Sequence, residues 1–187
     1  ARGRDPHAAF SIEWYVSQAP ELAETGENPV LHYLRVGAAR GLSPHPLFRP
    51  AYYLRQLGAA ERNLNPLAHY LSQGWRRGLK PHPLFDPAWM AKAYPDLLGR
   101  EPLAHFIEHA AQELQHPGPW FDSALYAQTR GGERRLDLDP LSDYLLGGAW
   151  TGAQPREGFH PAAHLAAHPE LAEREVTPLE HWAGRGA

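Results

Sequence analysis

The sequence has no cysteine, and its only lysines are Lys80 and Lys92 among 187 residues. Without cysteine, disulfides, thiolate zinc sites and cysteine nucleophiles are excluded. This composition fits a reducing compartment, so we expect a cytoplasmic protein, with a secreted or cell-surface location as the alternative. No apolar run reaches the roughly 18 residues that a membrane span needs, and no signal peptide is visible. The formal net charge of −3 gives no reason to expect a nucleic-acid partner.

Several catalytic and cofactor motifs are also missing. The sequence has no P-loop, no G-x-G-x-x-G, no G-x-S-x-G and no EF-hand loop. We therefore predict no cofactor and no catalytic residues, and we expect that the chain is not itself an enzyme. In contrast, it has 19 Pro and 17 Gly, which favour many short elements joined by turns.

A repeated phrase dominates what is present. The stretch "NPVLHYLRVGAARGLSPHPLFRP" at 28–50 recurs as "NPLAHYLSQGWRRGLKPHPLFDP" at 65–87. Two markers extend this period through the chain: one proline (Pro29, Pro66, Pro102, Pro140 and Pro178) and one phenylalanine (Phe10, Phe48, Phe85, Phe121 and Phe159). Both predict five repeats of about 37 residues, at approximately 8–44, 45–81, 82–118, 119–156 and 157–187, in a single repeat domain, 1–187.

Each repeat reads as two short helices. In "FDPAWM", Asp86 suits the N-cap and Pro87 the first helical position. Phe85 and Met90 then occupy the two positions of a hydrophobic staple. The first helix is expected to stop near the proline of "APEL", "YPDL" or "HPEL".

The second helix is predicted to begin at a cap residue followed by proline. The caps are Asn28, Asn65, Asp139 and Thr177, and Glu180 completes a capping box with Thr177. We expect this helix to end after about two turns at left-handed glycines, namely Gly37, Gly74, Gly148 and Gly186. "SPHP" and "KPHP" read as rigid extended linkers. Because such short helices are marginal alone, we predict an all-α array of helix pairs, solenoid-like or compact, without a sheet.

One polar position recurs three residues after the marker proline. It holds His32, His69, His105, Asp143 and His181. A functional interpretation is a row of ligand-binding imidazoles. The structural interpretation is that each histidine bonds a backbone carbonyl of the adjoining helix while its ring packs. We favour the structural interpretation, because a residue present in every repeat usually maintains the repeat, and Asp143 fits a hydrogen-bonding role.

Two other histidine patterns suggest metal binding. "HFIEH" matches the H-x-x-E-H metalloprotease pattern over His105–His109, but the repeat already accounts for His105 and we see no third ligand. "FHPAAHLAAHPEL" spaces His160, His164 and His168 four apart, on one helix face, with Glu170 nearby. These three are the better metal candidates, although a divergent last repeat also explains them.

Candidate ligand-binding residues gather at "GWRRG". Trp75 beside Arg76 and Arg77 could stack on a sugar ring or anchor a protein partner. The counterparts of Trp75 are alanines, so this is not a function shared by the repeats. Trp150 falls one position later in the fourth repeat.

The phrases "NPLAHYLSQGWRRGLKPHPLFDPAWMAKAYPDL" and "FSIEWYVSQAPEL" resemble a tandem repeat of bacterial proteins. That repeat has the form F-D-x-x-x-Y-L-x-x-x-P-D-V followed by N-P-L-x-H-Y-L-x-x-G-x-x-E-G-R. It flanks or precedes glycosyltransferase domains of surface-polysaccharide synthesis and also occurs in some large secreted proteins. The resemblance covers the whole chain, is strongest over 28–107 and implies no catalytic residue.

This resemblance implies an accessory module of a glycan-assembling protein. We expect a non-catalytic scaffold that binds a protein partner, an attached glycosyltransferase domain or a glycan. The alternatives are a carbohydrate-binding module that uses Trp75, Trp150 and arginines, and a histidine-based metal protein or enzyme. Because the chain ends without a polar capping repeat, we expect further protein to follow or another chain to cover that end.

Overall fold

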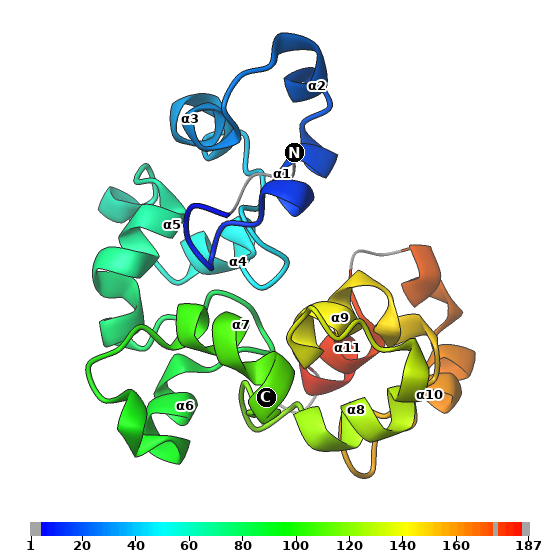
Figure 1. Cartoon of the computed structure of the whole chain (residues 1–187). Helices are drawn as coiled ribbons and strands as arrows, with labels where there is room; N and C mark the ends of the chain where they lie inside the picture. The colour runs from blue at the N-terminus through cyan, green and yellow to red at the C-terminus, as the bar shows by residue number, and fades with distance from the viewer. Residues whose placement is uncertain (1–4, 174–175, 185–187) are drawn as a thin grey trace. The chain divides into compact units, whose positions relative to one another are not determined.

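The computed structural model describes residues 5–173 and 176–184, and that part of the chain is helical (Figure 1). The α-helices are α1 (Ile12–Gln18), α2 (Glu21–Thr25), α3 (Pro29–His32), α4 (Pro50–Arg55), α5 (Pro66–His69), α6 (Pro87–Ala93), α7 (Pro102–Glu113), α8 (Ser123–Arg130), α9 (Pro140–Leu146), α10 (Pro161–Ala167) and α11 (Pro178–Gly184). Within the described ranges there are isolated β-bridges but no strands. The predicted all-α class is confirmed. The division into five repeats stays a prediction.

Short 3₁₀ and π-helical turns extend several of these helices. The π-helical turns Tyr33–Gly37 and Tyr70–Gly74 continue α3 and α5. The 3₁₀ turns are Ala59–Glu61, Trp75–Arg77, Pro95–Leu97, Gly131–Glu133, Gly148–Trp150 and Pro169–Glu173. The helix pair predicted for each repeat is therefore interrupted by further short turns.

The helices begin where the capping pattern predicted. The side chains of Asn65 and Asp139 accept from the amides of Ala68 and Ser142, at 3.0 and 2.8 Å. Asp86 accepts from Trp89 at 2.9 Å, which begins α6. These bonds satisfy amides that have no partner inside the helix.

The capping box at the start of α11 is also present. The Thr177 amide donates to Glu180 Oε2 at 2.9 Å, and the Glu180 amide donates to Thr177 Oγ1 at 3.4 Å. The predicted capping box is therefore confirmed, and it fixes the direction in which α11 leaves the preceding chain.

The core is built from the staple aromatics. Phe48 and Tyr53 lie with ring centroids 5.3 Å apart, and Tyr53 meets Tyr70 edge-on at 5.7 Å. The same arrangement recurs for Phe10 with Tyr15 and for Phe121 with Tyr126, at 5.2 and 5.3 Å. All of these rings are buried, so their packing holds each first helix against a second helix.

The linkers are turns rather than the predicted extended segments. In His45–Phe48, the Phe48 amide donates to the His45 carbonyl at 2.9 Å, and His45 Nδ1 accepts from the Leu47 amide at 3.2 Å. His82–Phe85 repeats both bonds. Proline is favoured at the second position of such a turn, and the buried histidine ring satisfies a further amide. The extended prediction was wrong because it ignored that side-chain acceptor.

The predicted glycine caps were assigned to the wrong glycines. Gly74 has helical angles of φ −61° and ψ −43°, while Gly78 has φ +71°. Gly41 and Gly152 are likewise left-handed, with φ of +76° and +83°. The left-handed positions are thus four residues beyond the predicted ones. The fourth predicted cap, Gly186, lies outside the described residues.

The chain forms two compact units, Ala1–His105 and Phe106–Ala187. Their boundary falls within α7, which runs for 12 residues where the other predicted second helices are shorter. In the part of the chain that the structure describes, no helix is both long and apolar enough to cross a membrane.

Candidate functional site

Two of the recurring histidines, His32 and His69, bond tyrosine hydroxyls inside the protein. The Tyr53 hydroxyl is hydrogen-bonded to His69 Nδ1 at 2.6 Å, and Tyr15 is bonded to His32 in the same way at 2.7 Å. All four side chains are buried. The structural interpretation therefore had the wrong partner, because the bond goes to a staple tyrosine and not to a backbone carbonyl.

An outer carboxylate and an arginine extend each of these pairs. Glu61 Oε1 lies 3.3 Å from His69 Nε2, and Arg77 Nη1 donates to Glu61 Oε1 at 2.6 Å. Because a carboxylate accepts, Nε2 of His69 carries the proton and Nδ1 accepts from Tyr53. The Arg77 hydrogen bond lowers the pKa of Glu61. Arg77, predicted as a ligand-binding residue, is thus engaged within the fold.

The same network recurs around His32. Glu21 lies 3.6 Å from His32 Nε2 and pairs with Arg40. Hydrogen bonding to Arg40 lowers the pKa of Glu21.

A carboxylate replaces the histidine in the fourth predicted repeat. Tyr126 donates to Asp143 Oδ2 at 2.5 Å, and Arg130 Nε forms an ion pair with the same oxygen at 3.5 Å. Burial, followed by the bond to Asp143, raises the pKa of Tyr126, which keeps its hydroxyl a donor. Asp143 and histidine therefore serve one purpose, which is to bind a buried tyrosine.

A glycine is required opposite each of these tyrosines. A Cβ at Gly37, Gly74 or Gly148 would stand 1.9, 2.0 or 1.8 Å from the hydroxyl oxygen of Tyr15, Tyr53 or Tyr126, respectively. The third predicted repeat has Met90 at the tyrosine position and Ala110 at the glycine position. Methionine has no hydroxyl, so an alanine fits there. Sequence reasoning missed this coupling, although the paired change is visible in the sequence.

Trp75 and Arg76 contact each other. The Arg76 guanidinium carbon lies 4.3 Å from the centre of the Trp75 ring, and Arg76 Nη1 donates to the Ser72 carbonyl at 2.8 Å. Trp75 Nε1 donates to the Leu71 carbonyl at 3.2 Å. One face of the half-buried indole is therefore covered by Arg76.

Trp150 lies in the other unit and is 43% exposed. It is the last residue of the 3₁₀ turn Gly148–Trp150. Its exposed indole surface suits stacking on a planar or sugar ring.

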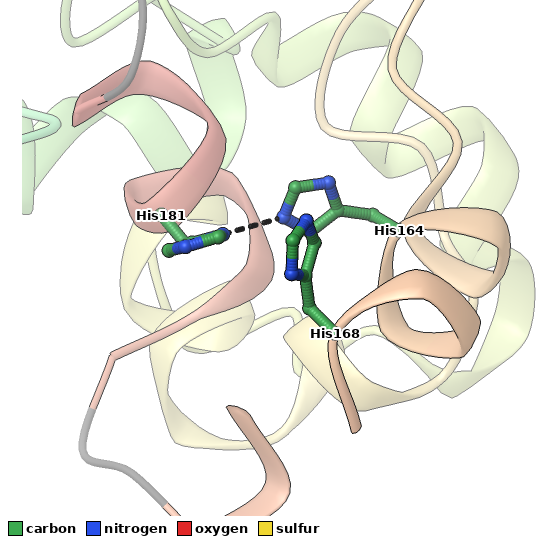
Figure 2. Close-up of side chains that lie close together, drawn as sticks. All are labelled: His164, His168 and His181. Carbon is green, nitrogen blue, oxygen red and sulfur yellow. Dashed lines mark hydrogen bonds between the residues drawn. The ribbon is translucent and has the colours of Figure 1, made fainter. Parts of the chain in front are cut away.

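Three histidines converge in the last predicted repeat (Figure 2). His164 on α10, His168 at its C-cap and His181 on α11 each offer a ring nitrogen, and the three nitrogens lie within 4.8 Å of one another. His164 Nε2 is hydrogen-bonded to His181 Nδ1 at 2.9 Å. His168 Nδ1 lies 3.3 Å from Glu170 Oε1. These residues are half-buried, and we call His164, His168 and His181 the histidine cluster.

The other histidine candidates lie apart from this cluster. His160 is the N-cap residue of α10, and its Nδ1 lies 3.3 Å from Gln154 Nε2. His105, Glu108 and His109 lie on α7, where His109 Nδ1 is 3.7 Å from a Glu113 oxygen. Across the described ranges, 5–173 and 176–184, the histidine cluster is the only group of three or more potential metal ligands. His181, which the sequence placed among the structural positions, therefore joins two of the predicted metal candidates.

No family model, curated protein or solved structure matches this chain.

Proposed function

We infer that this chain is a non-catalytic helical-repeat interaction module of a bacterial glycosyltransferase or polysaccharide-assembly protein, and that it binds a protein partner. The supporting observation is that the recurring polar side chains bond one another inside the fold. His69 binds Tyr53, and Asp143 takes the same role with Tyr126. The positions that the repeats share thus maintain structure. We therefore expect the residues that recognise a partner to lie on the surface of the protein.

An apolar surface on the first helix pair suits such a partner. Leu31 on α3 and Leu34 in the following turn are 60% and 59% exposed. They stand three residues apart and so share a side of the helix. The position of Leu31 carries Ala68, Ala104, Ser142 and Glu180 in the other predicted repeats. Leu31 is an exposed leucine at a position where small or polar residues otherwise occur, and together with the exposed Leu34 it favours a protein contact.

Capture from bacterial lysate, with proteins and glycans identified by mass spectrometry, tests this function. We expect the chain to retain a glycosyltransferase or polysaccharide-assembly protein. The double variant Leu31→Ser/Leu34→Ser is expected to retain at least about tenfold less, which is the loss of about 1.4 kcal/mol of binding free energy. The control is Leu136→Ser, which changes an exposed leucine in the other unit. Capture of no such protein would contradict the proposal.

Glycan binding is the second candidate, and the exposed indole of Trp150 favours it. Retention of a glycan without protein, lost in Trp150→Ala, would support this candidate and replace the first. Trp75→Ala is the comparison, because Arg76 covers the Trp75 ring.

A further inference from the structure

We propose that His164, His168 and His181 form a binding site for a divalent transition-metal ion of the zinc class. This site is independent of the proposed partner binding. Three imidazoles are a ligand set that zinc uses in proteins, and they leave a fourth tetrahedral position for water or another ligand.

The fold explains why these three positions meet. Their equivalents in the fourth predicted repeat are Tyr126, Arg130 and Asp143. The polar atoms of these residues also converge, because Asp143 Oδ2 lies 2.5 Å from the Tyr126 hydroxyl and 3.5 Å from Arg130 Nε. In the first repeat, two of the three equivalents, Tyr15 and His32, are hydrogen-bonded. In the first and fourth predicted repeats, these positions hold a buried pair of polar side chains. In the last predicted repeat, all three positions hold a histidine, and each histidine offers a ring nitrogen as a ligand.

The distance between the nitrogens of His164 and His181 fits a metal after a small movement. Two ligands of a tetrahedral zinc with Zn–N bonds of about 2.0–2.1 Å stand about 3.3 Å apart. His164 Nε2 and His181 Nδ1 are now 2.9 Å apart and share a proton. An ion would displace that proton and separate the nitrogens by a few tenths of an ångström. The third ring, His168, lies with its centroid 4.9 Å from that of His164 and 4.6 Å from that of His181.

Glu170 supplies an outer contact of the kind found at metal sites. Its carboxylate lies 3.3 Å from His168 Nδ1. A carboxylate there favours the tautomer with the proton on Nδ1, so Nε2 of His168 is the nitrogen that would coordinate. Figure 2 shows the rings of His164 and His168, both projecting from the α10 side, facing His181 on α11. A bound ion would therefore join the two helices.

The informative variant is His164→Tyr. It restores the residue found at this position in three other predicted repeats, where tyrosine bonds the equivalent of His181. We expect this variant to fold and to lose one of three metal ligands. His168→Ala removes a ligand but keeps both partners of the His164–His181 hydrogen bond. His160→Ala is the matched control, since His160 is the N-cap residue of the same helix, makes no side-chain cap hydrogen bond there and lies outside the cluster.

The test is calorimetric titration of the purified chain with Zn²⁺ alone, together with the visible absorption spectrum of the chain loaded with Co²⁺. We expect one equivalent of Zn²⁺ and a tetrahedral Co²⁺ spectrum for the unaltered chain and for His160→Ala. His164→Tyr and His168→Ala should each weaken binding by at least about 100-fold, and Glu170→Gln by about 10- to 100-fold.

Two further readouts separate a site from adventitious binding. Zn²⁺ should raise the melting temperature of the unaltered chain but not that of His164→Tyr. Affinity should rise with pH, because the ion competes with protons for the imidazoles. Absence of saturable binding, or equal binding by folded His164→Tyr and by the unaltered chain, would overturn the proposal.

Discussion

The buried tyrosines of three predicted repeats, Tyr15, Tyr53 and Tyr126, each depend on two residues distant in sequence. Tyr53 needs the acceptor on His69 and the missing side chain of Gly74. Burial raises the pKa of its hydroxyl, so it remains a hydrogen-bond donor at physiological pH. The glycine therefore serves close approach, which is a different reason for glycine from the left-handed backbone of Gly78.

A double-mutant cycle tests this coupling. Gly74→Ala puts a Cβ 2.0 Å from the Tyr53 hydroxyl oxygen, so we expect a loss of about 1–3 kcal/mol in the free energy of unfolding. Tyr53→Met with Gly74→Ala copies Met90 and Ala110, so the double variant should lose less than the sum of the single variants. Urea denaturation measures all three.

The control for this cycle is Gly78→Ala. Because Gly78 has φ +71°, this variant should lower the free energy of unfolding by about 1–2 kcal/mol through backbone strain. Adding Tyr53→Met should not reduce that loss. Additive effects of Gly74→Ala and Tyr53→Met would contradict the proposed coupling.

At the scale of elements, side-chain amides attach the linkers to the first helices. Gln56, the C-cap of α4, donates from Nε2 to the Lys80 carbonyl at 2.7 Å and accepts from the Lys80 amide at 2.9 Å. Gln18 and Ser43 form the same pair of bonds, at 2.8 and 3.0 Å. In both cases the residue that leads into the linker turn is bonded to the first helix of its own predicted repeat.

Gln56→Glu tests this attachment with almost no change of shape. The new carboxylate can still accept from the Lys80 amide, but it places a second oxygen against the Lys80 carbonyl. We expect a loss of about 1–3 kcal/mol in the free energy of unfolding at pH 7, measured by urea denaturation. The exposed Gln73→Glu, which adds the same charge, should change stability by less than about 0.5 kcal/mol. Similar losses in both variants would show that charge alone is responsible.

At the scale of the whole molecule, acid has opposite effects on two buried groups, one in each compact unit. Burial lowers the pKa of His45, in Ala1–His105, to about 3. Burial raises the pKa of Asp139, in Phe106–Ala187, to about 6. As pH falls below 6.5, unfolding lets His45 take up a proton, so its contribution to stability is lost. Over the same fall the folded Asp139 takes up a proton first, so its contribution to stability rises.

Two variants separate these contributions. Between pH 7 and pH 4.5, His45 should lower the free energy of unfolding by about 2.5 kcal/mol, and Asp139 should raise it by about 2 kcal/mol. His45→Asn keeps an acceptor for the Leu47 amide, and Asp139→Asn keeps the cap of α9. Urea denaturation at both pH values measures how far the free energy of unfolding falls from pH 7 to pH 4.5. Compared with the unaltered chain, this fall should be smaller for His45→Asn and larger for Asp139→Asn. Identical pH profiles would contradict both assignments.

The helical class, the capping residues and the aromatic staples followed from the sequence, because each is a local interaction between residues within one helical turn. The period of the repeated phrase predicted which residues play equivalent parts. It also indicated His164 and His168 as potential ligands, since residues four apart share a helix face.

Tertiary structure decided the partners of these residues. The bonds from Tyr53 to His69 and from His164 to His181 span 16 and 17 residues, and no local pattern specifies which side chains meet across two helices. For the same reason, only the structure separated His160 from the histidine cluster and added His181 to it. Gly74 looked like a helix cap because left-handed backbone is the usual reason for glycine there. Its actual role depends on a hydroxyl from another helix, whose position is set by packing.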